Sequence, residues 1–529
     1  MRKKADKLHQ PSTPSFVATF EVETNSAGFG QLEKMLNAYR QVYNATLGEL
    51  VRRLKRARKS PEWEAARKLP KGSEERKAAF AEVRKKYGLS VGEAQKVAQR
   101  LVEGHFVRLT NSRIVQQVAK RAWRAIEKVM VGKAKRVRFK RRDDFQSFET
   151  NANDTGIRVV MGTGTVCVGK LTFEFKADET NPYHVHALKH RVKYARIVKR
   201  VINGRSRWFV QMILEGKPYR DPEKHTTQNG ERVGLDFGPS LIAVSTTTDS
   251  FQIPLSQELD RRQAEIRRLQ RRLDRSQRAT NPHNYQPNGT VKKGRKQWKQ
   301  SSRYRRTKQQ LKDLERRKTA QRKSLHGRLA NRIVRLGNQI HTEKVSYRGW
   351  QKQFGRSIQH HAPSAFEGIL TRTAETLGGG TRLINTAQTA LSQTCLCGNR
   401  KKKTLSERTH WCDTCGFTAP RDQFSAYLAL YTFWTDGKWV VNLNEARSGI
   451  HRHRTLASGL KPNSRPGAVG PELVDVSQTR QRELGFQTGP PPTGRASRAR
   501  PGKGNLEPSA SSRNGSGCPE QEESPSSTA

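Results

Sequence analysis

The sequence has few acidic residues for its length and lacks any long apolar run. Aspartate and glutamate number 47 against 101 lysines and arginines, which gives the 529 residues a formal net charge of +54. An excess this large opposes compaction by self-repulsion unless a polyanion neutralises it, so nucleic acid is the expected partner. A run of about 20 apolar residues, which a membrane-spanning helix needs, is absent, and the basic N-terminus lacks the apolar stretch of a secretory signal. We therefore expect no membrane association and a cytoplasmic, nucleoid-associated protein.

Cysteine is also scarce, and its distribution is uneven. The chain has 6 cysteines, of which Cys167 and Cys518 stand alone. The other four form two pairs, Cys395-Leu-Cys397 and Cys412-Asp-Thr-Cys415, each followed by a glycine. In a reducing cytosol such clustering indicates a metal site rather than disulfides. Four thiolates would close a tetrahedron around one structural zinc ion and leave no position for a catalytic water.

Two features of this cysteine cluster leave alternatives open. The first pair is one residue tighter than the usual Cys-x-x-Cys, so chelation by Cys395 and Cys397 is expected to be strained. The alternative is four unpaired cysteines that bind no metal and lie near one another in the sequence only by chance.

Three acidic residues stand in unusual surroundings. Asp236 interrupts the apolar strand pattern of RVGLDFG, Glu343 stands at the start of a short β-like run after a long helical stretch, and Asp422 follows the second cysteine pair. A carboxylate buried in an apolar strand is costly unless something compensates it. Each acid alone has a simpler explanation: Asp236 could cap a turn, Glu343 could pair with an arginine, and Asp422 could cap its helix.

The order of these acids, together with the cysteine pairs, resembles the TnpB family of insertion-sequence RNA-guided nucleases, which are related to compact type V CRISPR effectors. The resemblance spans roughly residues 15–440. It rests on the stretches RVGLDFG, HTEKVSYRGW, LSQTCLCG, CDTCG, APRDQFSAYLA and AKRVRFKRRDDFQSF. The chain departs from the family pattern in its Cys-x-Cys pair and in Phe424, which stands where the family usually has asparagine.

The resemblance implies an α/β multidomain fold with a ribonuclease H-like (RuvC) nuclease core, a zinc ribbon and an N-terminal β-barrel. It also implies that Asp236, Glu343 and Asp422 are catalytic and hold two Mg²⁺ ions, which would hydrolyse DNA phosphodiesters. Guide RNA and double-stranded DNA would be the partners, and the activity would be associated with transposition. The basic segment ahead of the barrel supplies the candidate nucleic-acid contacts Arg136, Arg138, Lys140, Arg141 and Arg142.

The resemblance to the TnpB family and the hydrophobic periodicity of the sequence together divide the chain into segments. The Asn203-Gly204 dipeptide between two alternating arms predicts a β-hairpin within the barrel. The expected segments are 1–27 for the first barrel strand, 28–132 for a helical recognition-type domain, 133–228 for the wedge-type barrel, 229–394 for the nuclease core with a helical hairpin at 256–340, 395–416 for the zinc ribbon, 417–444 for the last core helix and 445–529 for a disordered tail.

Competing functions fit parts of this pattern. The chain could be a guide-directed DNA-binding protein that does not cut, acting as a regulator or transposon accessory. It could be a compact type V CRISPR effector, a zinc-ribbon RNA-binding protein or a strand-transfer transposase. The three ordered acids favour the endonuclease over the binding proteins.

Overall fold

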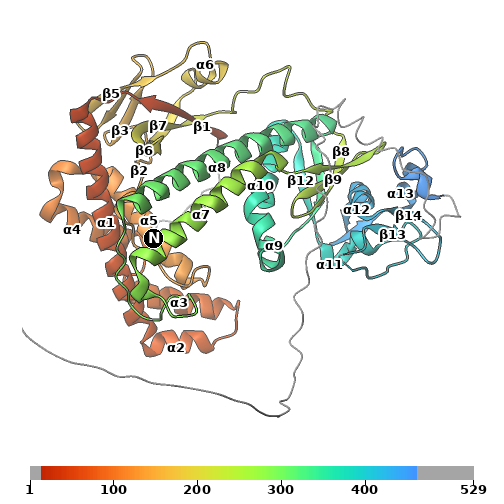
Figure 1. Cartoon of the computed structure of the whole chain (residues 1–529), viewed down its shortest axis with the longest axis horizontal. Coiled ribbons are helices and arrows are strands. Elements are labelled where there is room, and N and C mark those ends of the chain that lie inside the picture. The colour runs from red at the N-terminus through yellow and green to blue at the C-terminus, as the bar shows by residue number, and fades with distance from the viewer. Residues whose placement is uncertain (1–12, 405, 461–529) are drawn as a thin grey trace, which may run out of the picture. The chain divides into compact units, whose positions relative to one another are not determined.

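The structure is a computed structural model that describes residues 13–404 and 406–460. The described residues all belong to the unit Met1–Phe486, and they form a mixed α/β protein with three separate hydrophobic cores (Figure 1). None of the described helices combines the length and apolar character needed to cross a membrane. The expectation of a disordered tail concerns residues 445–529, of which 461–529 lie outside the described residues, as does Cys518.

The first core lies between a seven-stranded sheet and a group of helices. The sheet order is β2-β6-β7-β1-β5-β4-β3, and β3 near one edge contacts β6 near the other, so the sheet curls. The strands are β1 (Ser15–Val22), β2 (Ser147–Glu149), β3 (Ile157–Val160), β4 (Thr165–Val168), β5 (Leu171–Lys176), β6 (Val192–Ile202) and β7 (Arg205–Glu215). The helices are α1 (Ser26–Arg58), α2 (Pro61–Lys68), α3 (Glu74–Lys86), α4 (Val91–His105), α5 (Ser112–Met130) and α6 (Pro182–Leu188).

Two local predictions in this region can be compared with the structure. The Asn203-Gly204 hairpin is confirmed: both residues have positive φ, 51° and 79°, and β6 pairs with β7 on either side of them. The first helix of the segment expected at 28–132, α1, begins just before that segment, at Ser26. The cause is Asn25, whose side-chain oxygen accepts a hydrogen bond from the Gly28 N–H at 2.8 Å and caps the helix.

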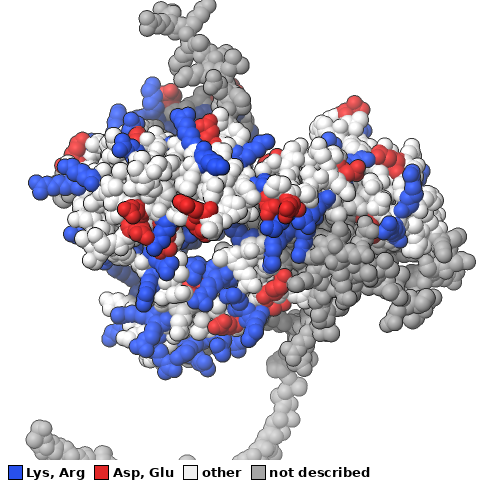
Figure 2. Space-filling model, turned by 90° about the horizontal axis from the view of Figure 1, so that it is seen from above, with Lys and Arg blue, Asp and Glu red and all other residues white. Residues whose placement is uncertain are grey.

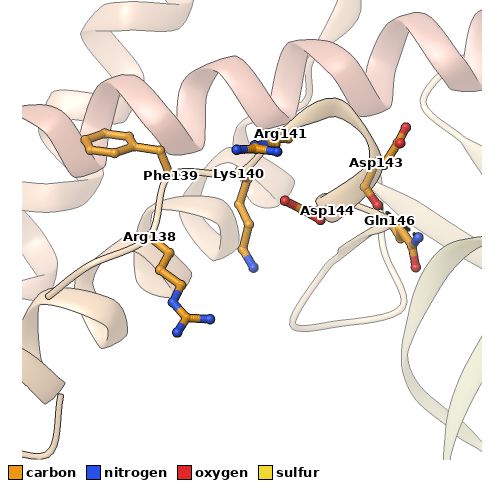
Figure 3. Close-up of a pocket in the computed structure, with 7 residues that line it drawn as sticks. All are labelled: Arg138, Phe139, Lys140, Arg141, Asp143, Asp144 and Gln146. Carbon is orange, nitrogen blue, oxygen red and sulfur yellow. Dashed lines mark hydrogen bonds between the residues drawn. The ribbon is translucent and has the colours of Figure 1, made fainter. Parts of the chain in front are cut away.

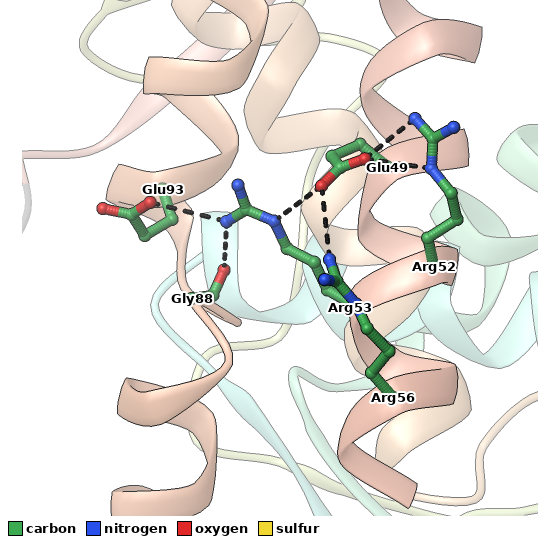
Figure 4. Close-up of polar contacts among 6 residues, drawn as sticks. All are labelled: Glu49, Arg52, Arg53, Arg56, Gly88 and Glu93. Atoms are coloured by element: carbon green, nitrogen blue, oxygen red, sulfur yellow. Dashed lines mark hydrogen bonds and ion pairs between the residues drawn. The ribbon is translucent and has the colours of Figure 1, made fainter. Parts of the chain in front are cut away.

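Part of the arginine content is used for structure inside this first region. Arg53 on α1 donates to Glu49 Oε1 at 3.1 Å, to the Gly88 carbonyl at 3.0 Å and to Glu93 Oε2 at 3.4 Å (Figure 4). These contacts tie α1 to the start of α4. On the face shown in Figure 2, lysine and arginine cover more area than aspartate and glutamate.

The second core packs against a five-stranded sheet of order β10-β9-β8-β11-β12. The strands are β8 (Arg232–Phe237), β9 (Leu241–Ser245), β10 (Ser250–Pro254), β11 (Gln339–Glu343) and β12 (Gly380–Ile384). β11 is parallel to β8 and to β12, whereas β9 is antiparallel to both of its neighbours. The connecting helices are α7 (Asp260–Thr280), α8 (Ser302–Leu336), α9 (Tyr347–His361) and α10 (Pro363–Thr376). α7 and α8 lie side by side as a hairpin within the expected range 256–340 (Figure 1).

The third core joins the cysteine region to the end of the described chain. Its elements are α11 (Thr386–Thr389), β13 (Thr409–Trp411), β14 (Thr418–Pro420), α12 (Arg421–Leu430), β15 (Thr432–Thr435), β16 (Lys438–Val441) and α13 (Leu443–Ile450). Short 3-10 turns complete the chain: η1 (Val107–Leu109), η2 (Arg142–Asp144), η3 (Gln257–Leu259), η4 (Pro282–Asn284), η5 (Leu391–Gln393) and η6 (Ala457–Leu460).

The structure corrects two boundaries near the C-terminus. The helix expected over 417–444 ends at Leu430 and is followed by the β15–β16 hairpin, because Asp436 and Gly437 both adopt positive φ and turn the chain. The chain also stays ordered beyond residue 445. His453 and Leu456 are fully buried, and the Tyr427 hydroxyl donates to the Ala446 carbonyl at 2.7 Å. The disordered-tail expectation is therefore wrong for 445–460.

Candidate functional site

Two of the three candidate acids stand at the carboxyl ends of neighbouring parallel strands. The register of β8 and β11 pairs Leu235 with Thr342, so Asp236 and Glu343 are the next residues along the two strands. Glu343 is the last residue of β11, which corrects the expectation that it starts a strand. Crevices at the carboxyl ends of parallel strands are the usual place for a functional site in an α/β sheet.

Helix α12 covers the sheet face that carries both acids. Side chains alternate along a strand, so Gly234 and Asp236 share one face of β8, and His341 and Glu343 share the same face of β11. A Cβ on Gly234 would lie 1.9 Å from the Ala426 carbonyl oxygen, so only glycine lets the α12 backbone approach this closely. The opposite face of β8 carries apolar residues that pack into the second core.

The direction of α12 brings the third acid to the same end of the sheet. Arg232, at the start of β8, donates to the Leu430 carbonyl at 3.1 Å, and His341 Nδ1 lies 3.0 Å from the Ala429 carbonyl. The last turn of α12 therefore lies over the start of β8, and its first turn, which contains Asp422, lies toward the strand end that bears Asp236.

Electrostatic coupling is consistent with this placement. Burial raises the pKa of Asp236 well above its usual value, and the negative charges of Asp422 and Glu343 raise it further, while Arg421 and Ser425 act in the opposite direction. Burial also raises the pKa of Glu343, and its Oε1 accepts a hydrogen bond from the Leu391 N–H at 3.2 Å. The pKa of Asp236 thus depends on the charges of both other acids.

Asp422 is held by two arginines that sequence reasoning gave no role. Arg421, only 8% exposed, donates from Nε and Nη2 to Asp422 Oδ1 at 3.1 and 3.0 Å. Arg408 Nη1 reaches Asp422 Oδ2 at 3.4 Å, and Arg421 also donates to the Thr404 carbonyl at 2.9 Å. The Arg-Asp dipeptide was the only signal in the sequence, and it does not reveal Arg408, which is 14 residues away.

The four clustered cysteines come together as a site able to hold a zinc ion. Their sulfur atoms all lie within 4.8 Å of one another, with Cys395 and Cys415 at 3.6 Å and Cys397 and Cys412 at 3.5 Å. The glycine after each pair has positive φ, 91° at residue 398 and 70° at residue 416, which lets each turn bring two thiols to one point. The tight Cys-x-Cys spacing therefore does not prevent convergence.

The surroundings of the thiols affect their ionisation in opposite directions. Burial raises the pKa of the Cys395 and Cys415 thiols, whereas, against the effect of burial, the backbone N–H groups of Cys415 and Thr414 and the neighbouring thiols lower the pKa of Cys412. Thiolates are the form that binds zinc, so metal binding at this site would release protons.

The three carboxylates do not form an equally tight group. Within residues 13–404 and 406–460, the cysteines are the only group of three or more His, Cys, Asp or Glu side chains close enough to share an ion. The positive charge next to Asp422 comes instead from Arg421 and Arg408. Oxygen donors of this type nonetheless suit Mg²⁺, which needs only a few carboxylates and retains several waters.

The cysteine site and Asp422 belong to one packed unit. The β13–β14 hairpin carries the second cysteine pair at its turn, and α12 begins at the residue after β14. Phe424, 1% exposed, packs its ring 4.7 Å from His410 and 4.9 Å from Phe417, both on the ribbon side. The aromatic residue that departs from the TnpB pattern therefore fastens α12 to the ribbon rather than supporting the acid with an amide.

The candidate nucleic-acid residues lie elsewhere, along α1. Arg136, Arg138, Arg141 and Arg142 are exposed and Lys140 is half-buried. The Lys140 backbone is fixed by the Asn44 side chain, which accepts from its N–H at 2.8 Å and donates to its carbonyl at 2.9 Å. A pocket of about 630 Å³ lies at this segment, and Figure 3 shows that its Arg138 and Lys140 side chains extend in the same direction. Its lining residues are Arg138, Phe139, Lys140, Arg141, Asp143, Asp144 and Gln146.

Comparison with known proteins gives a limited result. No protein-family model matches the sequence. No curated protein matches it either. A cryo-EM structure of the Cas12f1-sgRNA-target DNA complex aligns with 75% of this chain and 81% of its own at 12% identity and a TM-score of 0.44. A cryo-EM structure of a CRISPR-Cas12f ternary complex aligns with 76% of this chain and 81% of its own at 13% identity and a TM-score of 0.27. TM-scores this low do not establish a shared fold.

Proposed function

We propose that the chain is a Mg²⁺-dependent, RNA-guided DNA endonuclease of the TnpB type, with Asp236, Glu343 and Asp422 as its catalytic residues. The observation that carries the proposal is the coupling of Asp236 to the other two acids at the carboxyl end of β8, beneath α12. A desolvated carboxylate whose pKa is raised further by two like charges is costly for stability alone, and such clusters occur mainly at functional sites.

The order of the strands supports the type of nuclease core. Three consecutive antiparallel strands, β8 to β10, are extended at β8 by the parallel strands β11 and β12. This is the arrangement expected of a ribonuclease H-like (RuvC) core. The helical hairpin α7–α8 then lies between the third and fourth strands, and the cysteine site lies between the fifth strand and α12.

The residues around the acids have definable roles. The Leu391 N–H orients Glu343, and Arg421 and Arg408 orient Asp422. Bound Mg²⁺ ions, held by the three carboxylates, would activate water and stabilise the leaving oxygen of a phosphodiester. Because the pKa of Asp236 is raised, this carboxyl group holds a proton more readily than a free aspartate does, so protons would compete with a cation for it.

Zinc in the cysteine site would have a structural role. It would fix the ribbon, and through the Phe424 contacts it would fix the first turn of α12 that carries Asp422. Guide RNA, double-stranded DNA and a link to transposition enter the proposal through the resemblance of the sequence to the TnpB family. The segment 136–142 is the proposed nucleic-acid contact near the N-terminal sheet.

The experiment uses full-length protein purified together with its bound RNA. That RNA is sequenced, and DNA that matches it is offered with Mg²⁺ to wild type and to Asp236→Asn. We expect wild type to cut and Asp236→Asn to lose cutting while still binding RNA. Asp436→Asn is a matched control, because it makes the same chemical change at an exposed turn whose positive φ asparagine tolerates. Cutting by Asp236→Asn at the wild-type rate, or cutting that survives removal of the RNA, would contradict the proposal.

A further inference from the structure

A groove runs between the two helices of the α7–α8 hairpin, and neither the three acids nor any residue of the segment 136–142 lines it. It contains two adjoining cavities of about 770 and 340 Å³. The larger is lined by Arg268, Leu269, Arg272, Arg275, Ser276, Ala279, Thr280, Arg303 and Thr307. The smaller is lined by Arg272, Arg303, Arg306, Thr307 and Gln310.

The lining divides into a basic rim of five arginines and six uncharged side chains, none of them aromatic. The five rim arginines are exposed, and no acidic residue lines either cavity. Among the described residues, none of these five forms an ion pair. They lie at positions 268, 272 and 275 of α7 and 303 and 306 of α8, spacings of three and four residues that place each set on one face of its helix. Two cationic rows therefore flank the groove from opposite sides.

Neighbouring arginines on the same helices behave differently. Arg278 pairs with Asp274 at 2.9 Å and donates to the Gly289 carbonyl at 2.9 Å. Arg316 and Arg317 on α8 pair with Asp313 at 2.7 and 2.8 Å. Acidic residues on the hairpin thus pair with Arg278, Arg316 and Arg317, whereas no acidic residue lines the groove.

The five rim arginines indicate which class of ligand the groove can bind. Five guanidinium groups with no anion between them repel one another, and the repulsion is relieved by a ligand that brings several negative charges at once. Guanidinium forks match phosphate oxygens in bidentate geometry. The uncharged lining side chains offer no aromatic surface on which bases could stack, which favours a polymer backbone as the ligand.

We propose that this groove binds the sugar-phosphate backbone of a nucleic acid strand through Arg268, Arg272, Arg275, Arg303 and Arg306. This proposal adds a second nucleic-acid-binding surface, outside the segment 136–142, to the proposed function. It rests on the proposed function for the biological identity of the strand. The binding is independent of sequence, because every contact is to phosphate.

The test compares two double variants of the full chain that remove the same charge from the same helices. Arg272→Ala with Arg303→Ala removes the two arginines that line both cavities. Arg271→Ala with Arg305→Ala removes exposed neighbours that line neither cavity. Dissociation constants are measured over a range of KCl concentrations without Mg²⁺ and without a chelator, which leaves the cysteine site intact, with a labelled RNA and with duplex DNA of the same sequence as separate probes.

Loss of two phosphate contacts should flatten the dependence of log K on log [KCl] by about 1.4 for single-stranded RNA and about 1.8 for duplex DNA. At 0.1 M salt this corresponds to a loss of affinity of roughly 25- to 60-fold. The control pair should retain the wild-type slope. A response with either probe supports the groove and shows which nucleic acid occupies it.

Equal slopes for the two double variants with both probes would overturn the proposal, because the arginines would then act only through net charge. If the groove variant loses its thermal unfolding transition, Arg272→Lys with Arg303→Lys replaces it. That variant should keep the salt slope and lose affinity, since lysine retains the charge but not the fork, and unchanged affinity would count against the groove. Because these measurements contain no Mg²⁺ and need no cleavage, an enzyme that does not cut would refute the proposed function and leave this result interpretable.

Discussion

Replacement of Gly234 by alanine tests whether the packing of α12 on β8 holds the acids together. The added Cβ would lie 1.9 Å from the Ala426 carbonyl oxygen, 3.0 Å from the Ala426 carbonyl carbon and 3.1 Å from Leu430 Cγ. The first two are backbone atoms, so no side-chain rotation relieves the clash. A contact of 3.0 Å to the oxygen requires α12 and β8 to separate by about 1.1 Å.

This separation has two consequences that can be measured independently. Forcing one methyl group into a packed interface costs about 1–3 kcal/mol of unfolding free energy. Asp422 is part of the helix that moves, whereas Asp236 stays on the strand. A misplacement of about 1 Å at a catalytic site costs about 10²-fold in rate, so we expect cleavage to fall by that order even where the protein remains folded.

The assay is urea unfolding in parallel with DNA cleavage, and Gly327→Ala is the control. Gly327 lies within α8 and has no atom within 4 Å of the position a Cβ would take, so alanine there should be neutral or stabilise by about 0.5–1 kcal/mol. Wild-type stability of Gly234→Ala would refute the close approach of α12. Reduced stability with an unchanged cleavage rate would refute the dependence of the acids on that packing.

Three further predictions concern the ribbon and the buried histidines. Cys412→Ser with Cys415→Ser, or chelation of zinc, should lower the melting temperature and cleavage together, and intact cleavage would show that the ribbon does not support α12. Phe424→Ala should cost about 3–5 kcal/mol in chemical unfolding, because its ring fills the contact between ribbon and helix, and a loss typical of a surface site would contradict this. Burial lowers the pKa of His326 and His361 to about 4, whereas the unfolded chain binds these protons near pH 6.5. The contribution of these two histidines to the free energy of unfolding is therefore fully present above pH 6.5 and is lost as the pH falls toward 4. Between pH 7 and 5 the loss is at most about 2 kcal/mol per histidine, and urea midpoints that do not change over that range would refute the prediction.

Much of the local structure was predictable because short-range signals govern it. The Asn203-Gly204 turn, the strand that carries Asp236 and the helical hairpin at 256–340 each follow from a periodicity or a turn dipeptide. The β15–β16 hairpin carries an equally strong signal in Asp436-Gly437. It was missed because the preceding helical pattern was extended through it toward residue 444.

The tertiary features of the candidate site were less accessible from sequence. The four cysteines could be grouped because metal ligands fall into recognisable pairs, and they do converge. Catalytic roles for Asp236, Glu343 and Asp422 remain a prediction that the structure makes testable. Arg408 could not be connected with Asp422 from the sequence, because their contact depends on the ribbon returning its chain to the start of α12.

The arginine contacts of Asp422 bear on how a cation would enter the site. Both carboxylate oxygens already have guanidinium partners, Oδ1 with Arg421 and Oδ2 with Arg408. Arg421 is buried and also anchored to the Thr404 carbonyl, whereas the Arg408 side chain is 72% exposed. An exposed ion pair contributes little stability, so Oδ2 is the oxygen that exchanges its partner at least cost. The contact with Arg421 would thus keep Asp422 oriented, while Oδ2 could exchange Arg408 for a metal ion.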